Sequence, residues 1–282
     1  MKSDCHIHMV LDGVEWRSAI ARHKCAPDRE FIRSALSRYE GLGYDYLRDG
    51  GDRWGVGALA REMAPDFGIR YRTPLAPLCK AGHYGGFIGE TYENLREYGA
   101  LVKKTRAQGG DFIKIMISGL MDFDRFGVLT EDGFSPEEIR ELVRIAHEEG
   151  FSVMAHCNGA ATIRAAAEAG VDSVEHGAYA DDAALHAMAE NQTVWVPTLS
   201  TVGNLRGKGR FSEAAVGAIF ADTSEKLRKF AAMGGLIACG SDAGAWAVPH
   251  AADTEEALLL SLLGEGAEGV LTRGTAVIRE KF

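Results

Sequence analysis

Residues with metal-ligating side chains recur at the ends of short apolar segments along this chain. His6 and His8 are two residues apart, so in a β-strand both imidazoles point to the same face. Four later apolar segments each contribute one further polar residue, namely Lys114, His156, His176 and Asp242. Neutral imidazole and carboxylate groups are natural ligands of zinc and similar ions. The set therefore predicts a metal site, provided that the fold brings these segment ends together.

Each of these residues also has a simpler explanation when it is taken alone. The two histidines of the first segment match surface residues on an edge strand, and the later ones match structural residues with satisfied hydrogen bonds. Lys114 lies inside the apolar segment 112–116, where a lysine either reaches solvent or is costly to bury unless neutral or paired. The combination of all six residues favours the metal site over these separate explanations.

Short apolar segments alternate with longer amphipathic ones, which predicts strands that alternate with helices. We expect strands at 5–9, 44–48, 70–77, 112–118, 152–156, 173–176, 193–198 and 236–241. We expect helices near 28–41, 54–64, 91–108, 135–149, 160–169, 181–190, 212–233 and 254–263. Ser135 and Pro136 are typical of a helix start, and Gly150 is typical of a helix end.

Eight strand–helix units in 282 residues predict an α/β fold of the TIM (β/α)₈ barrel type, as one domain over residues 1–282. An open doubly wound sheet is the alternative, but the chain has neither GxGxxG after the first strand nor GxxxxGK[ST] anywhere. In a barrel, catalytic groups project from the carboxyl ends of the strands. The six candidate ligands would then meet at one end of the barrel.

Composition and charge exclude several classes of partner. The formal net charge of −9 argues against a broad nucleic-acid surface, because neutralising phosphates requires clustered Lys and Arg. The longest apolar stretches, such as 257–263, are too short to span a membrane, and no apolar leader precedes His6. Five cysteines without CxxC spacing argue against a disulfide framework. We therefore expect a cytoplasmic protein that binds neither nucleic acid nor a membrane.

The motifs together resemble those of the amidohydrolase superfamily of metal-dependent hydrolases. The motifs that carry the resemblance are Asp-Cys-His-Ile-His at 4–8, Lys114, His156, His176 and Gly-Ser-Asp-Ala-Gly at 240–244. Three further stretches resemble the branch that contains imidazolonepropionase and the prolidase-like peptidases and arylamidases, namely 46–51, 81–86 and 112–119. The resemblance spans nearly the whole chain.

The resemblance implies a binuclear site, because the lysine of that branch is carboxylated by CO₂ and bridges two divalent metal ions. One ion, expected to be zinc, would be held by His6, His8, carboxylated Lys114 and Asp242, and the other by Lys114, His156 and His176. A metal-bridging hydroxide would attack the substrate, and Asp242 would pass its proton to the leaving amine. A mononuclear site is the alternative, although the HxxE element typical of such relatives is missing near His156 and His176.

The implied reaction is hydrolysis of an amide bond in a dipeptide, an N-acyl amino acid or a cyclic amide. A lactone or ester hydrolase on the same site and a non-catalytic metal-binding barrel are the alternatives. His83 lies in a loop that resembles the branch's Gly-His-Gly loop, and it is expected to donate a hydrogen bond to the substrate carbonyl. A plain loop histidine is the simpler explanation. Tyr84 is expected to contact substrate beside it.

Residues near the strand ends suggest further roles. Aromatic side chains there that could line an apolar pocket are Trp54, Tyr84, Phe123, Phe126 and Trp246. Arg48 and Asp49 are expected to pair beneath the site. The segment 204–210 carries three basic residues and two glycines, and it is expected to be a solvated loop, with a substrate-binding lid as the alternative.

Most members of the branch carry a small accessory β-sandwich, built from residues before the first strand and after the last. Only five residues precede His6, and 264–282 alone follow the last expected helix. We therefore expect most or all of the sandwich to be missing. Surfaces that it covers elsewhere would then be polar or covered by another subunit, which predicts a homo-oligomer.

Overall fold

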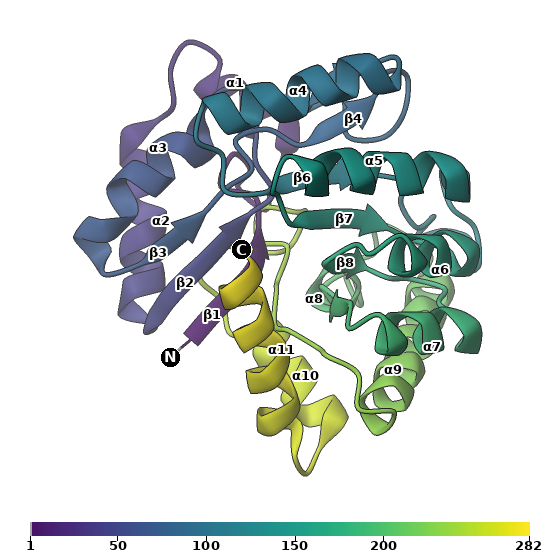
Figure 1. The fold of residues 1–282 in the computed structure, drawn as a ribbon. Helices are drawn as coiled ribbons and strands as arrows, with labels where there is room; N and C mark the ends of the chain where they lie inside the picture. The colour runs from purple at the N-terminus through teal and green to yellow at the C-terminus, as the bar shows by residue number, and fades with distance from the viewer. Residues whose placement is uncertain (1) are drawn as a thin grey trace.

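The computed structural model describes residues 2–282, with helices arranged around a ring of strands (Figure 1). The strands are β1 (Lys2–Ile7), β2 (Tyr44–Asp49), β3 (Arg70–Arg72), β4 (Leu78–Lys80), β5 (Glu90–Tyr92), β6 (Ile113–Met116), β7 (Val153–Cys157), β8 (Ser173–His176) and β9 (Val194–Val196). All neighbouring strands pair in parallel, in the orders β1-β2-β3 and β5-β4-β6-β7-β8-β9. This is the parallel α/β arrangement that the sequence predicts.

Only the first three residues of the third expected strand, at 70–77, form a strand, and a second short strand, β4, follows the expected range. β3 pairs with β2, and β4 pairs with β6, so the two strands belong to different sheets. Pro74 and Pro77 stand between the two strands, and a proline cannot donate to a strand ladder. The prolines therefore explain why the strand breaks where a continuous one was expected.

The eighth expected strand, at 236–241, forms bridges to its neighbours and no regular ladder. On one side Trp195 of β9 bridges Ile237, and on the other Ile7 of β1 bridges Ala243. The amide of Cys5 donates to the carbonyl of Cys239 at 2.8 Å. This segment therefore lies between β9 and β1.

The helices match the eight expected ones, with three additions. The helices are α1 (Trp16–His23), α2 (Arg29–Gly41), α3 (Val56–Met63), α4 (Leu95–Ala107), α5 (Pro136–Glu148), α6 (Ala160–Glu168), α7 (Asp182–Glu190), α8 (Ser200–Gly203), α9 (Glu213–Ala232), α10 (Thr254–Leu263) and α11 (Ala267–Lys281). The start of α5 is as predicted, because the Ser135 side chain accepts from the Glu138 amide. Helices α1, α8 and α11 were not predicted from the sequence.

Helix α11 closes the end of the barrel opposite the carboxyl ends of the strands. Its C-terminal end lies over the middle of the ring in Figure 1. Ile278 and Phe282 are buried with Cys5 and Phe112 in one apolar cluster, where the rings of Phe112 and Phe282 are 5.1 Å apart. Two glycines inside this helix lower its intrinsic helix propensity, so its pattern was easy to miss.

The structure also bears on the predictions about the β-sandwich, the cysteines and membrane-spanning segments. All nine strands described in residues 2–282 belong to the two parallel sheets, so this part of the chain contains no β-sandwich. The five cysteines carry free thiols. Among residues 2–282, no helix has the length and apolar character needed to span a bilayer. The single domain, the homo-oligomer and the cytoplasmic location stay predictions.

We expect Gly274→Ala to destabilise the barrel, because a Cβ at this position of α11 would overlap the backbone carbonyl of Ile237. Overpacking against backbone should lower the free energy of unfolding by about 1–3 kcal/mol. Gly269→Ala is the matched control on the same helix, since a Cβ there meets only the end of the Arg273 side chain. Denaturant titration of both variants measures the difference, and equal stabilities would contradict the assigned packing of α11.

Candidate metal centre

The first group of candidate ligands meets at the carboxyl ends of β1 and of the segment that follows β9. Nε2 of His6 and Nε2 of His8 are 3.4 Å apart. Oδ1 of Asp242 lies 3.5 Å from the first of these nitrogens and 3.3 Å from the second. Ligand atoms of the three side chains all lie within 4.8 Å of one another, and all three residues are buried. This is the spacing of side chains that can share one cation.

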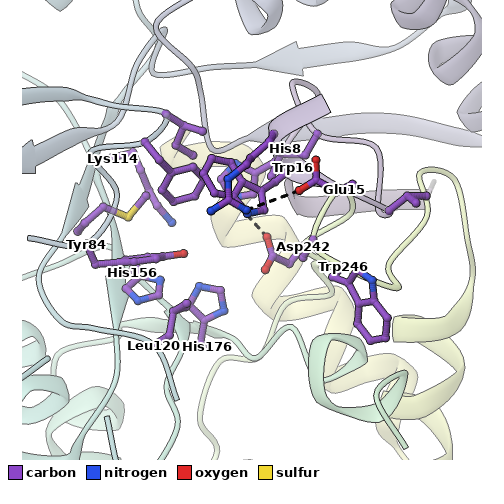
Figure 2. A pocket seen from close by; sticks show the side chains of 18 of the residues that line it. His8, Glu15, Trp16, Tyr84, Lys114, Leu120, His156, His176, Asp242 and Trp246 are labelled. Carbon is purple, nitrogen blue, oxygen red and sulfur yellow. Dashed lines mark ion pairs between the residues drawn. The ribbon is translucent and has the colours of Figure 1, made fainter. Parts of the chain in front are cut away.

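The second group adjoins the first. The rings of His156 and His176 have centroids 4.6 Å apart, and His176 lies 5.2 Å from the ring of His6. Figure 2 shows Lys114, His156 and His176 around the same space as Asp242. The fold therefore brings all six predicted ligands to one end of the barrel.

The site holds several buried polar atoms that lack partners. Nζ of Lys114, Nδ1 of His8 and Oδ1 of Asp242 are buried without a hydrogen-bond partner. Such atoms are rare in folded proteins, because each forfeits its hydration without compensation. A set of unpartnered donors and acceptors around one space therefore fits bound cations better than it fits a purely structural role.

Burial also sets the protonation of these groups in the protein without metal. Desolvation lowers the pKa of His8 and of His156 to about 3, with the positive charge of Lys114 as the next contribution. Burial likewise lowers the pKa of Lys114 and raises the pKa of Asp242. The imidazoles are therefore neutral near pH 7, which is the form that binds a metal ion.

Hydrogen bonds on the far side of each ring orient three of the histidines. Nδ1 of His6 donates to Oε2 of Glu175 at 2.7 Å. Nε2 of His156 donates to the carbonyl of Gly119 at 3.1 Å, and Nδ1 of His176 lies 2.7 Å from Oγ1 of Thr198. Each bond occupies one ring nitrogen and leaves the other free for a metal, as is usual for metal-binding histidines.

A fully buried ion pair lies behind His6. The Arg48 guanidinium donates to Oε1 of Glu175 at 2.9 Å and to the carbonyl of Cys5 at 2.7 Å. Both charged side chains have no exposed surface. The expected pairing of Arg48 with Asp49 is therefore wrong: the Asp49 carboxylate accepts instead from the amide of Met9, on the opposite side of the strand.

Glu175 is the functional residue that sequence reasoning missed. It stands directly before the candidate ligand His176, inside a strand whose residues are all buried. A buried carboxylate in such a strand requires a charged partner, so its presence was a signal for a second charged residue nearby.

The backbone around the site includes strained and crowded positions. His176 and Asp242 adopt positive φ angles of 68° and 59°, which side chains other than glycine rarely take. Such strain persists only where the surrounding structure requires it, and it gathers at functional sites. Gly50 follows β2 where a Cβ would overlap the imidazole of His8. Its glycine identity therefore makes room for a candidate ligand.

A cavity of about 480 Å³ opens onto the candidate ligands. Of the aromatic residues expected to line it, Tyr84 and Trp246 do so, while Trp54, Phe123 and Phe126 do not. Trp16 and Phe87 complete an aromatic wall, with ring centroids 5.2 Å apart. The Tyr84 ring lies 4.7 Å from that of His156, and burial raises the pKa of its phenol. Tyr84 is therefore a neutral hydrogen-bond donor near pH 7.

His83 lies outside the lining of this cavity. Its side chain is 40% exposed, with Nδ1 3.3 Å from Oε2 of Glu131 and its ring against Phe134. The same carboxylate accepts from the amide of Tyr84, so Glu131 holds this loop in place. The role of His83 in catalysis stays a prediction.

Residues 53–269 match the sequence profile of the Amidohydrolase family. The chain belongs to the amidohydrolase family. Ochratoxinase from Aspergillus niger is 31% identical, in an alignment that covers 85% of this chain and 56% of the relative. The chain therefore spans about half the length of the curated relatives it matches.

Solved structures confirm the fold class. A Xaa-Pro dipeptidase with bound methionine superimposes with a TM-score of 0.78 at 22% identity, covering 99% of this chain and 75% of that one. The crystal structure of A. niger ochratoxinase gives 0.76 at 23% identity, covering 98% and 70%. A prolidase complexed with N-methylphosphonate-L-proline gives 0.77 at 24%, covering 99% and 74%.

We predict that Glu175→Gln weakens metal binding, because Nδ1 of His6 loses its carboxylate acceptor. Loss of such an outer partner typically lowers metal affinity about 10- to 100-fold. The variant should also lower the free energy of unfolding by about 3–5 kcal/mol, because it leaves a buried charge without its partner. Chelator competition measures the affinity, and Glu168→Gln on the exposed face of α6 is the control.

A double variant separates positioning from stability. Arg48→Met with Glu175→Gln removes both buried charges, so most of the lost stability should return. Metal affinity should stay low, because the carboxylate behind His6 is still missing. Recovery of both properties would mean that Glu175 only balances the charge of Arg48.

Proposed function

We propose that this chain hydrolyses an amide bond of a small molecule, such as a dipeptide, an N-acyl amino acid or a cyclic amide. The reaction would use two divalent cations, and zinc is the expected metal. The observation that carries the proposal is that five ligand-type side chains line one cavity and His6 adjoins them, with unpartnered buried atoms on Lys114 and Asp242. Membership of the amidohydrolase family supports the reaction class.

The candidate ligands divide into two sets around Lys114. His6, His8 and Asp242 would hold one cation, and His156 and His176 the other. Lys114 would serve both sets once its neutral amine has added to CO₂. A new N–C bond forms, the nitrogen loses one proton, and the carbamate carries a single negative charge. The buried, unpartnered Nζ supports this assignment.

The side chains around the cations would orient the substrate and move protons. Divalent cations at these residues would polarise the amide carbonyl and make water acidic enough to attack it near neutral pH. Asp242 would take the proton of the attacking water on a carboxylate oxygen and deliver it to the leaving amine nitrogen. The Tyr84 hydroxyl would donate a hydrogen bond to the carbonyl oxygen, where negative charge develops. The aromatic wall would exclude bulk water.

Metal removal tests the proposal directly. Dialysis against a chelator should abolish hydrolysis of N-acyl amino acids, and added zinc should restore it. Lys114→Ala should lower kcat and the amount of bound metal together, because one side chain serves both sets of ligands. If the protein hydrolysed lactones or esters but not amides, the proposed substrate class would be wrong. Stoichiometric metal without any turnover would favour the non-catalytic barrel.

Two neighbouring variants test the assigned hydrogen-bond donor. Tyr84→Phe should lower kcat/KM about 10- to 100-fold with metal content unchanged, the range for loss of a hydrogen bond to a developing charge. His83→Ala tests the prediction made from the loop motif, and it too should lower kcat/KM without loss of metal. A drop in metal content for either variant would instead make that residue structural or a ligand.

A further inference from the structure

The loop at 204–212 is held in place at the mouth of the cavity by several hydrogen bonds. The side chain of Asn204 donates to the carbonyl of Ala247 at 2.9 Å. The Glu213 carboxylate accepts from the amides of Gly207 and Gly209, and the Asp124 carboxylate accepts from the amide of Ser212 at 2.8 Å. The carboxylates of Glu213 and Asp124 are therefore occupied by backbone amides of this loop.

Arg210 presents an unpaired guanidinium from this loop. Its guanidinium lies 4.4 Å from the ring of Trp246 and 5.4 Å from that of Phe211. In residues 2–282, its side chain forms no ion pair or hydrogen bond, and it lines the same cavity as the candidate ligands. Stacking on aromatic rings fixes the plane of a guanidinium and leaves its N–H edge free.

Two other arginines near the cavity mouth have polar partners, which Arg210 lacks within residues 2–282. Arg17 also lines the cavity, but it stacks on Trp16 and lies 3.9 Å from the carboxylate of Glu15. Arg206 stacks on Phe220 and donates to a backbone carbonyl, and it does not line the cavity. Of these three arginines, Arg210 is the one that lines the cavity and forms no ion pair or hydrogen bond within residues 2–282.

We infer that Arg210 forms a carboxylate-binding subsite, so that the substrate is an amide with an apolar body and a free carboxylate. A planar guanidinium edge matches a carboxylate in a bidentate pair. The aromatic wall of the same cavity suits the apolar body. The chain carries a formal net charge of −9, so a local cation is needed to favour an anionic substrate. This inference rests on the proposed amide hydrolysis and narrows its substrates.

Three related substrates test the subsite with zinc-loaded protein. N-acetyl-L-phenylalanine carries the carboxylate on the amine side of the amide, and N-glutaryl-2-phenylethylamine carries it on the acyl side. N-acetyl-2-phenylethylamine lacks it. Arg210→Gln should lower kcat/KM for at least one carboxylate-bearing substrate about 10- to 100-fold, the range for a lost charged hydrogen bond, and leave the neutral one within about twofold.

Two control variants separate the subsite from general effects on the loop. Arg206→Gln removes a stacked arginine of the same loop and should change none of the three rates. Arg210→Lys keeps the charge without the bidentate geometry, and it should recover only part of the loss. The substrate that shows the loss identifies the side of the amide that carries the carboxylate. Equal losses on all three substrates, or no loss, would overturn the subsite.

Binding measurements distinguish failure of the subsite from failure of the proposed reaction. Calorimetry with N-acetyl-L-phenylalanine and N-acetyl-2-phenylethylamine should show tighter binding of the first to the unmodified protein, and Arg210→Gln should remove the difference. This result without any turnover would retain the subsite and reject the hydrolysis. Turnover without a carboxylate preference, or no binding of N-acetyl-L-phenylalanine, would reject the subsite.

Discussion

The buried ion pair of Arg48 and Glu175 is the interaction on which the candidate site depends. Two charges without exposed surface are stable only when their hydrogen bonds are satisfied, and here they are shared among three strands. Glu175 uses its second oxygen to orient His6, so the same pair that joins β2 to β8 also orients a candidate ligand. Phe282 of the closing C-terminal segment covers Arg48 at 4.4 Å. Packing at the end of the barrel covered by α11 therefore helps to hold the ion pair behind His6 at the other end.

The convergence of the candidate ligands was predictable from the sequence, because the fold makes strand ends coincide. In a ring of parallel strands, every residue at a carboxyl end faces the same opening, so His156, His176 and Asp242 could be assigned without knowing any loop. Contacts between strands were not predictable in this way. Arg48 was predicted to pair with its sequence neighbour Asp49. Its actual partner is Glu175, and that contact depends on how the strands β1, β2 and β8 align in the fold.

Loops and breaks escaped prediction for a related reason, since they depend on contacts distant in sequence. The side chain of His83 lies beside the Glu131 carboxylate, and no pattern in the sequence near His83 indicates that contact. Prolines interrupted the third expected strand, and glycines concealed α11, because local propensity competes with tertiary packing. The position of the Arg210 guanidinium likewise depends on the loop that places it against the Trp246 ring.

The central claim is that one end of this barrel holds two cations around a modified Lys114. A crystal structure of the zinc-loaded protein, with anomalous data collected at the zinc edge, tests this claim most directly. The account predicts two anomalous peaks, one among His6, His8 and Asp242 and one beside His156 and His176, with carbamate density on Nζ of Lys114. A single peak with an unmodified lysine would contradict it.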